Sequence, residues 1–475
     1  MSNFKNNRSL MSDFSLTSSR TCRIAALALL AAAAGCKKDS ITQVTDPDIF
    51  NVGDYDTPQG AAPLRIGVVA NFTTAFDGST DSYVTMSGNM ADEMLASDTF
   101  DGRLTINARK SVEVNSEMET VYRNMQRARA GAQRAVAIIK TSTPDSTVNQ
   151  AEVYMYLGYS ELLLGEGWCP GVPFSSEDGT SQTFGDPQTT NQVMVAAAAH
   201  FDTALTTLGA ATGTAADRVR NGSKIGQGRA LLNQGKFTEA KNAVSGVPTN
   251  YLLNTGHSAN SGSDGQWGGT TSGKSRYKLT SLEGGNGLPF LEQSSTADPR
   301  INWSASSRVG FSGQFTKLPN SNKFTQYGDG VLTTGAEARL IELEAQLQTD
   351  DQPTRDAVFT SLNSLRTTGA PIGGKTGSDL IKVAAMSGTA PTTKAAAIDL
   401  LYKERGYWFW LTGHRLGDMR RLVTVYGRNA ENVYPSGAMA TETSPIPGNY
   451  GTSTAVTIPF SERNNPKFQG CLDGV

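Results

Sequence analysis

The sequence has little histidine, little cysteine and no excess of charge of either sign. Its 475 residues include 3 histidines and 4 cysteines, and 42 lysines and arginines stand against 44 aspartates and glutamates, for a net charge of -2 at pH 7. A chain with this balance has no positive field that would attract a phosphate backbone. We therefore expect no nucleic acid partner.

Motifs for metals and cofactors are also missing. The three histidines, His200, His257 and His414, lie far apart in the chain, and no two cysteines have the C-x-x-C spacing of a zinc or iron site. The sequence pattern therefore predicts no metal site and no cofactor.

Long hydrophobic runs are absent apart from residues 24–34, which are too few to span a bilayer but match the core of a signal peptide. Basic residues precede this run, as they do in signal peptides: Lys5, Arg8, Arg20 and Arg23. We predict that residues 1–35 are a signal peptide. Met11 is an equally good start, because it gives a signal peptide of more typical length.

The predicted signal peptide ends in Ala33-Ala34-Gly35-Cys36, which resembles the lipobox at which bacterial lipoproteins are cleaved and acylated. The usual leucine three positions before the cysteine is replaced by Ala33. The resemblance implies that Cys36 is lipidated and that residues 36–55, which lack an apolar period, are a flexible tether. The protein would then be anchored to a membrane without crossing it. The alternative is ordinary secretion after cleavage at an Ala-x-Ala site.

Export changes what the remaining cysteines predict. Cys22 leaves with the signal peptide and Cys36 takes the lipid, so only Cys169 and Cys471 stay available. An oxidising compartment permits disulfides. We predict a structural Cys169–Cys471 bridge, with a reactive pair as the alternative.

Amphipathic helices alternate with polar connections along the chain. In residues 121–140, apolar side chains recur at helical spacing on one face and arginines lie on the other. The same pattern predicts helices over 151–164, 193–208, 224–234, 237–244, 336–348, 354–366 and a final helical block over 393–425.

Two pairs of these helices have short connections. The helices over 224–234 and 237–244 are joined only by Gly235 and Lys236, which resembles the turn of a tetratricopeptide repeat. The second pair is separated by Asp350-Asp351-Gln352-Pro353, an acidic cap followed by a helix-starting proline. We predict an all-α fold of tetratricopeptide-repeat-like helix hairpins with long irregular loops, and one domain over residues 56–475.

A segment of different composition separates the two hairpins. Residues 257–275 are dominated by Gly, Ser, Thr and Asn but contain Trp267, and the chain stays loop-like to about residue 330. This composition predicts a segment outside the core. Loops of this size in a compact chain are usually functional or disordered.

Near the C-terminus, Leu401-Tyr402-Lys403-Glu404-Arg405 and Gly413-His414-Arg415-Leu416-Gly417-Asp418-Met419-Arg420-Arg421 resemble the C-terminal signature of the SusD/RagB family. In that family a Glu-Arg helix leads into a Gly-His-Arg turn and an Asp-Leu-Arg-Arg helix. The chain departs from the family where Gly406-Tyr407-Trp408-Phe409-Trp410 replaces a more charged stretch. Other pieces follow in the family's order: the lipobox, Ala151-Glu152 before Gly171-Val172-Pro173, Glu337-Ala338-Arg339-Leu340-Ile341, Leu362-Asn363-Ser364-Leu365-Arg366, and Ile458-Pro459 before Asn465-Pro466.

The chemistry of the signature residues indicates a structural role. Charge-assisted hydrogen bonds among them would lock two helices across the break at Gly413. A catalytic role for His414 with Asp418 needs a nucleophile, and the sequence has no Gly-x-Ser-x-Gly motif. The residues predicted to form this lock are Glu404, Arg405, His414, Arg415 and Asp418.

The resemblance implies a SusD-like fold and a lipoprotein exposed on the outer membrane. Such a protein binds an oligosaccharide or another nutrient and hands it to a SusC-like TonB-dependent transporter. It needs no catalytic chemistry, so we expect that the chain is not an enzyme.

Loop aromatics are the predicted ligand contacts, because the C–H face of a sugar stacks on an aromatic ring. No family motif covers the three candidates, Trp267, Tyr277 and Trp303. The alternative is that each ring packs its own loop onto the helical body. We expect the loops over 257–327 and 92–103 to converge on one side of that body, because insertions in helical repeats lie on exposed faces.

Two other classes of function stay open. A helical-repeat scaffold lipoprotein that binds protein partners in the envelope would share the hairpins but would not need the long loop. A surface glycosidase would need paired carboxylates across the substrate. Asp92 and Glu93 are adjacent, but neighbours on a helix do not face each other across a substrate.

Overall fold

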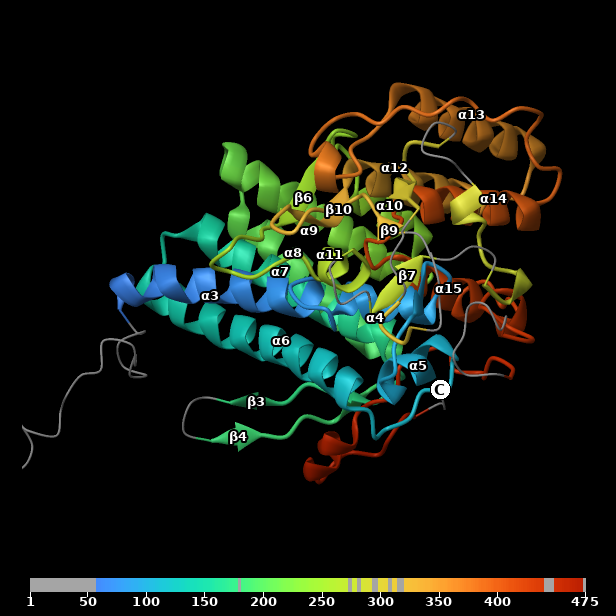
Figure 1. Cartoon of the computed structure of the whole chain (residues 1–475). Helices are drawn as coiled ribbons and strands as arrows, with labels where there is room; N and C mark the ends of the chain where they lie inside the picture. Colours follow the sequence, from blue (N-terminus) through green and yellow to red (C-terminus); the bar gives the residue numbers. More distant parts are fainter. Residues whose placement is uncertain are drawn as a thin grey trace, which may run out of the picture. The chain divides into compact units, whose positions relative to one another are not determined.

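Helices that follow one another in the chain pack side by side and form most of the fold (Figure 1). The computed structural model describes residues 57–472 except 178–180, 272–275, 280–282, 293–297, 306–309, 314–319 and 440–447. The described residues belong to one unit, Tyr55–Val475. The predicted signal peptide, the tether and Cys36 lie outside the described residues.

The helices fall into three groups along the chain. The N-terminal group is α3 (Pro58–Phe76), α4 (Tyr83–Met90) and α5 (Asp101–Asn107). The central group is α6 (Ser116–Ser142), α7 (Thr147–Gly167), α8 (Thr190–Leu208), α9 (Thr214–Asn233), α10 (Phe237–Ala243) and the short α11 (Gly265–Thr270). The C-terminal group is α12 (Gly335–Gln346), α13 (Gln352–Thr368), α14 (Lys394–Trp408) and α15 (Arg415–Thr424). The prediction of an all-α fold built from helix hairpins is therefore confirmed.

Short antiparallel strand pairs connect the loops. The pairs are β1 (Met94–Ala96) with β7 (Tyr277–Leu279), β2 (Val172–Pro173) with β5 (Pro187–Gln188), β3 (Ser176–Glu177) with β4 (Gln182–Thr183), β6 (Leu252–Thr255) with β10 (Gly330–Thr334), and β8 (Trp303–Ser304) with β9 (Asn320–Ser321). Two of them, β1 with β7 and β6 with β10, join segments that are distant in sequence. Single 3-10 turns lie at η1 (Glu283–Gly285), η2 (Phe290–Glu292), η3 (Gly374–Thr376), η4 (Ala430–Asn432) and η5 (Phe460–Asn464).

Glycine allows the central helices to pack closely. The ring of Phe201 on α8 lies against α7 and α9, where a Cβ added to Gly226 would come 2.3 Å from the ring. The turn between α9 and α10 uses Gly235 at φ 71, a left-handed conformation that glycine adopts without strain. The predicted hairpin turn is confirmed.

The predicted start of α13 is also confirmed. Asp351 is its N-cap, and the carboxylate accepts a 2.7 Å hydrogen bond from the backbone N–H of Thr354. Pro353 lies in the first turn of α13. A backbone N–H in this turn has no acceptor within the helix, so the N–H that proline lacks costs no hydrogen bond.

No described helix is both long and apolar enough to cross a membrane.

The disulfide joins the end of α7 to the C-terminal segment. Cys169 and Cys471 are bonded, with Cα atoms 5.5 Å apart and 302 positions between them in the sequence. Backbone hydrogen bonds flank the bridge, from the N–H of Cys169 to the carbonyl of Val456 and from Leu472 to Pro170. The predicted pairing is therefore the one found in the structure.

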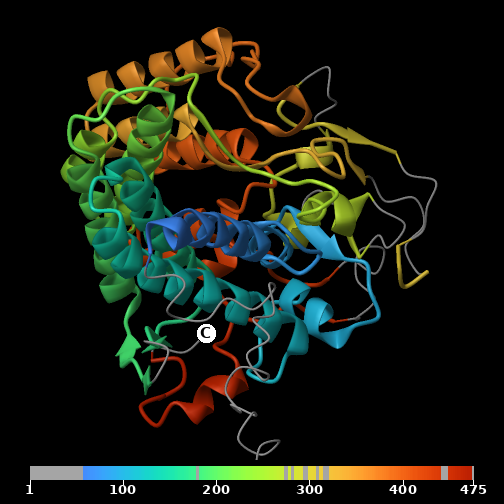
Figure 2. The same cartoon turned by 90° about the vertical axis from the view of Figure 1, so that its left-hand side faces the viewer.

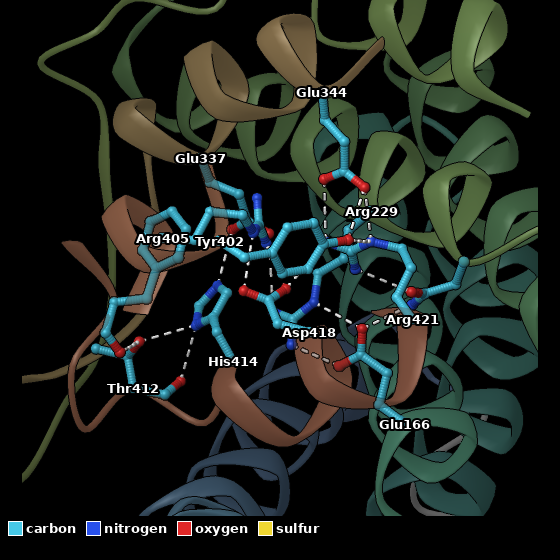
Figure 3. A network of polar contacts seen from close by, with 12 residues as sticks. Glu166, Arg229, Glu337, Glu344, Tyr402, Arg405, Thr412, His414, Asp418 and Arg421 are labelled. Carbon is cyan, nitrogen blue, oxygen red and sulfur yellow. Dashed lines mark hydrogen bonds and ion pairs between the residues drawn. The ribbon is translucent and has the colours of Figure 1, made fainter. Parts of the chain in front are cut away.

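The signature residues are buried and pair with charged groups of opposite sign, as Figure 3 shows for Arg405, His414 and Asp418. Asp418 on α15 accepts two 2.8 Å hydrogen bonds from Arg405 on α14 and one of 3.0 Å from Arg421. Burial would raise the pKa of the Asp418 carboxyl, but the two guanidinium groups hold this pKa well below its usual value. The predicted lock between the two helices is therefore confirmed for Arg405 and Asp418.

The other three signature residues do not complete this lock. They bind partners from other parts of the chain, so the prediction that all five bond across the Gly413 break is wrong for them. The reason is that α14 and α15 lie at the centre of the fold, where other elements supply nearer charges. The partners are Arg300 and Arg366 for Glu404, Glu337 for His414, and Asp92 for Arg415.

Peptide mapping without reduction should recover Cys169 and Cys471 in one linked peptide from the exported protein. Replacing both with Ser should lower the free energy of unfolding by up to about 5 kcal/mol in the chain-entropy model, because the bridge closes a very long loop. Finding both thiols free in the exported protein would rule out the bridge.

Replacing Asp418 with Asn should lower the free energy of unfolding by about 3–5 kcal/mol at pH 7, because Arg405 and Arg421 then lose the carboxylate that neutralises them in the core. The folded-state pKa of Asp418 is depressed, so its contribution is present above the usual value of 3.8 and is lost as the pH falls below it. In urea unfolding, the difference from wild type should persist to about pH 4 and shrink at lower pH.

Asp399→Asn provides the matched control. Asp399 also lies on α14 and pairs with an arginine, Arg428, at 2.9 Å, but its side chain is 62% exposed. An exposed pair contributes little, so this variant should unfold nearly as wild type does. Equal losses in the two variants would contradict the role assigned to burial.

Candidate functional site

The loops predicted to converge meet on one side of the helices in the part of the chain that the structure describes. Strand β1 pairs with β7, which places Ala96 opposite Tyr277. The N–H of Ser312 also donates to the carbonyl of Ser97 at 3.2 Å. Figure 2 shows the N-terminal segment in blue beside the loop segments in yellow. The expected convergence of the two loop regions is confirmed.

Two exposed phenylalanines lie at this meeting point. Phe100 and Phe311 are each 45% exposed, and their ring centroids are 6.4 Å apart. The guanidinium carbon of Arg276 lies over both rings, 4.7 Å from the centroid of Phe100 and 3.5 Å from that of Phe311. The cluster therefore places apolar ring surface and a cation side by side at the surface.

A buried carboxylate, that of Asp98, holds the Arg276 guanidinium against the two rings. Asp98 is fully buried and accepts hydrogen bonds from Arg276 at 2.7 Å and from Arg103 at 2.6 Å. Arg103 also donates to Asp81 at 2.7 Å. These ion pairs hold both guanidinium groups in one orientation, so the cluster is ordered before any ligand arrives.

We call Asp98, Phe100, Arg103, Arg276 and Phe311 the Phe100 site. Its rings can stack on the C–H face of a sugar, and its guanidinium groups can donate to hydroxyl or carboxylate oxygens. Its central arginine and aromatic residues were not among the sequence candidates. The available signal was an aromatic residue in a polar loop, as at Thr99-Phe100-Asp101, inside the region 92–103 predicted to converge.

Tyr277 does not belong to this surface, and its prediction as a stacking ring is wrong. The side chain is fully buried in a cluster with Met94, Leu279 and Trp410. Its hydroxyl donates to Asp81 at 3.0 Å. The β1–β7 pairing buries the ring, because it turns this position of β7 towards the core.

Trp267 and Trp303 are half-buried and pack against the same apolar cluster. Trp267 lies on α11, where its backbone N–H donates to the side chain of the N-cap residue Asp264 at 2.7 Å. Trp303 lies on β8. Ligand contact through their exposed parts stays a prediction. Because each ring also packs against the core, its loss should reduce stability, unlike the loss of an exposed loop ring.

The prediction that residues 257–275 lie outside the core is wrong for part of the segment. Asp264, Gln266 and Thr270 are buried, and the short helix α11 covers the chain near the end of α3. Composition misled here, because small polar residues allow a loop to pack closely against the helices.

The adjacent carboxylates considered for glycoside hydrolysis lie in the turn after α4 and not on the helix. Both are buried. Asp92 accepts from Arg415 at 2.7 and 2.9 Å, and Glu93 accepts from the N–H of Leu411 at 2.7 Å. Both carboxylates therefore hold the loop to the C-terminal helices.

A polar groove of about 660 Å³ lies elsewhere, between α6, the β2–β5 strands and the C-terminal segment. Its lining is rich in arginine, amide and hydroxyl groups. Arg129 in this groove is buried and donates to Gln126, Gln133 and the Ser175 carbonyl. We favour the Phe100 site over this groove, because the Phe100 site has two adjacent exposed rings beside a fixed guanidinium.

No family model matches the chain, and no curated protein is similar to it. Solved structures do resemble it. A SusD-like carbohydrate binding protein from Bacteroides vulgatus is 15% identical, with a TM-score of 0.62 over 87% of this chain and 97% of its own. A SusD superfamily protein from Bacteroides thetaiotaomicron is 16% identical, with a TM-score of 0.62 over 87% and 99% of the two chains.

A SusD superfamily protein from Bacteroides fragilis is 11% identical, with a TM-score of 0.64 over 87% of this chain and 99% of its own. At such low identity the likeness is one of fold, and it extends over nearly the whole of each neighbour. The chain therefore has the fold of the SusD superfamily, as the sequence resemblance predicts.

Proposed function

We propose that this protein is a cell-surface lipoprotein that binds an oligosaccharide or another nutrient and delivers it to a SusC-like TonB-dependent transporter. The observation that carries the ligand-binding part is the Phe100 site on a SusD-like fold. Two adjacent exposed rings beside a fixed guanidinium leave apolar area in water that a ligand can cover.

The chemistry of the site favours a sugar as the ligand. Phe100 and Phe311 offer apolar faces, and Arg276 and Arg103 offer N–H donors that the buried carboxylates keep in place. This combination of stacking faces and a few fixed polar groups is typical of small-ligand sites. Among the structural neighbours, one is described as a carbohydrate binding protein.

The membrane anchor and the transporter partner rest on other observations. Small residues precede Cys36 in a segment that resembles a lipobox, and the short apolar run before it fits a signal peptide. The SusD-like fold supports a SusC-like partner, since the resemblance implies that pairing. Co-purification of a TonB-dependent transporter with the protein tests the partner directly.

The buried carboxylates argue against one of the two other classes of function, and experiment separates the receptor from the second. A glycosidase needs two carboxylates across the substrate, whereas Asp92 and Glu93 are committed to Arg415 and Leu411 inside the core. A scaffold that binds only protein partners would also use exposed aromatic and arginine side chains, so glycan binding decides between it and a receptor. A reducing-sugar assay separates the receptor from the enzyme, and glycan pull-down separates it from the scaffold.

Replacing Cys36 with Ser should release the protein from the membrane fraction, because no described helix provides a second anchor. Lipid labelling and fractionation of cells measure the effect. Cys22→Ser is the control, since that residue should be removed with the signal peptide, and this variant should stay at the membrane. Continued membrane retention of the Cys36 variant would contradict lipidation at this residue.

Replacing Phe100 or Phe311 with Ala should weaken oligosaccharide binding by about 1 kcal/mol, a roughly fivefold rise in Kd, because each ring loses its stacking contact. The melting temperature should change little, since both rings are exposed. Calorimetry with oligosaccharides derived from starch, pectin and host glycans measures the effect. Trp267→Ala and Trp303→Ala test the two earlier candidates, and both should lower the melting temperature.

Phe460→Ala is the matched control, because Phe460 is an exposed phenylalanine with an arginine, Arg463, over its ring, but it lies in η5 and outside the converging loops. Its affinity should equal that of wild type. If both the Phe100 and Phe311 variants bind as strongly as wild type, the assignment of the Phe100 site as the ligand site is wrong. If the wild type binds none of these sugars, the result argues against a glycan ligand.

A further inference from the structure

Three ionisable side chains that are distant in sequence meet inside the fold. Asp77, the C-cap of α3, His257, which follows β6, and Asp264, the N-cap of α11, each point one ligand atom into the same space. These atoms all lie within 4.8 Å of one another. All three residues are buried, and the His257 side chain is only 1% exposed. The site is therefore closed to bulk water.

One oxygen of each carboxylate accepts a hydrogen bond from the protein, and the other oxygen accepts none. The Oδ2 atom of Asp77 accepts from the hydroxyl of Thr255, and the Oδ1 atom of Asp264 accepts from the N–H of Trp267 at 2.7 Å. The remaining oxygens, Asp77 Oδ1 and Asp264 Oδ2, have no hydrogen-bond partner. The used oxygens fix the orientation of the free ones, as outer contacts do for metal ligands.

His257 supplies the third atom. Its Nε2 lies 3.2 Å from Asp77 Oδ1 and 3.9 Å from Asp264 Oδ2, but neither ring nitrogen has a hydrogen bond of good geometry. Buried polar atoms normally have partners, so three such atoms facing one space need an explanation. The 3.2 Å separation is close to the ligand–ligand edge of about 3.3 Å that follows from metal–ligand distances of about 2.0–2.1 Å in a tetrahedral site, whereas the 3.9 Å separation is longer, so Asp264 would move closer to His257 when an ion binds.

The charge of the cluster points to a cation. Two carboxylates that face one buried space can both be ionised only with a counter-ion beside them. Asp329 adds to the negative potential at His257. The only basic group among the three ligands is the imidazole, and a divalent ion would neutralise both carboxylates.

The donor atoms indicate the class of cation. Imidazole nitrogen suits zinc and other first-row transition ions, whereas calcium and magnesium prefer oxygen ligands alone. One nitrogen with two carboxylate oxygens is a set that zinc accepts, and a fourth position stays for water or another group.

We propose that Asp77, His257 and Asp264 bind a divalent first-row transition cation, such as Zn²⁺, that ties the loop after β6 to the end of α3. The bound ion would join two loop positions to the helical body. Through the Asp264 cap it would also fix α11, which carries Trp267. The proposal does not depend on the glycan-binding function, because it concerns the loop itself.

The test uses the exported protein purified without a histidine tag, stripped with a chelator and titrated with Zn²⁺ alone. Wild type should retain about one zinc per chain by elemental analysis after dialysis, and zinc should raise its melting temperature. His257→Gln keeps a side chain of similar size and should weaken zinc binding at least tenfold. Asp264→Asn keeps the Oδ1 cap on α11 and should weaken it similarly.

His200→Gln is the matched control, because this histidine pairs with one carboxylate, Glu161, at 2.7 Å and is partly exposed. It should bind zinc as wild type does. The metal-free melting temperatures show whether His257→Gln folds, and Asp264→Asn decides the question if it does not. Failure of wild type to retain zinc, retention of Ca²⁺ in place of Zn²⁺, or wild-type zinc binding in the Asp264 variant would overturn the proposal.

Discussion

The rest of the structure depends on the buried ion pair between Arg405 and Asp418. Its two parallel hydrogen bonds join α14 to α15 at the centre of the fold, and Arg421 links the same carboxylate to Glu344 on α12. Guanidinium and carboxylate groups can be buried only when nearly all their polar atoms are paired, so the position of each helix is constrained by the others. The core of this protein is therefore specified by polar geometry as well as by apolar packing.

The same two helices also position the loops. Arg415 holds Asp92 and the backbone of Leu411 holds Glu93, so the chain that leads to Phe100 starts from a fixed point on the C-terminal helices. The loops on the other side of the site have contacts of the same kind, from Arg300 to Glu404 and from Lys323 to the Trp410 carbonyl. The residues of the C-terminal signature can therefore affect function without catalytic chemistry, because their contacts fix the positions of the loop residues.

The Phe100 site shows how this support is used. Asp98 is buried and polar, whereas the rings beside Arg276 are exposed, so the supporting part of the site lies in the core and its ligand contacts lie at the surface. Replacing an exposed ring alters the ligand contact with little effect on packing. The Asp77, His257 and Asp264 cluster lies on the same loop system and would add a second fixed point beside α11.

The sequence by itself determined the features that depend on near neighbours. Helical periodicity predicted α6, α7, α8, α10, α12 and α13 to within about five residues, the C-terminal end of α9, and α14 with α15 as one block, whereas α11 was missed. Gly235 predicted a hairpin turn, and Asp351 with Pro353 predicted a helix start, because periodicity, capping and backbone freedom act over a few residues. Elimination among four cysteines predicted the Cys169–Cys471 pair. Only the tertiary structure decided which loop aromatics are exposed, because the β1–β7 pairing buries Tyr277 and leaves Phe100 outside. It alone also brought His257 to Asp77 and Asp264, since burial and the meeting of charges depend on contacts between segments that no local pattern encodes.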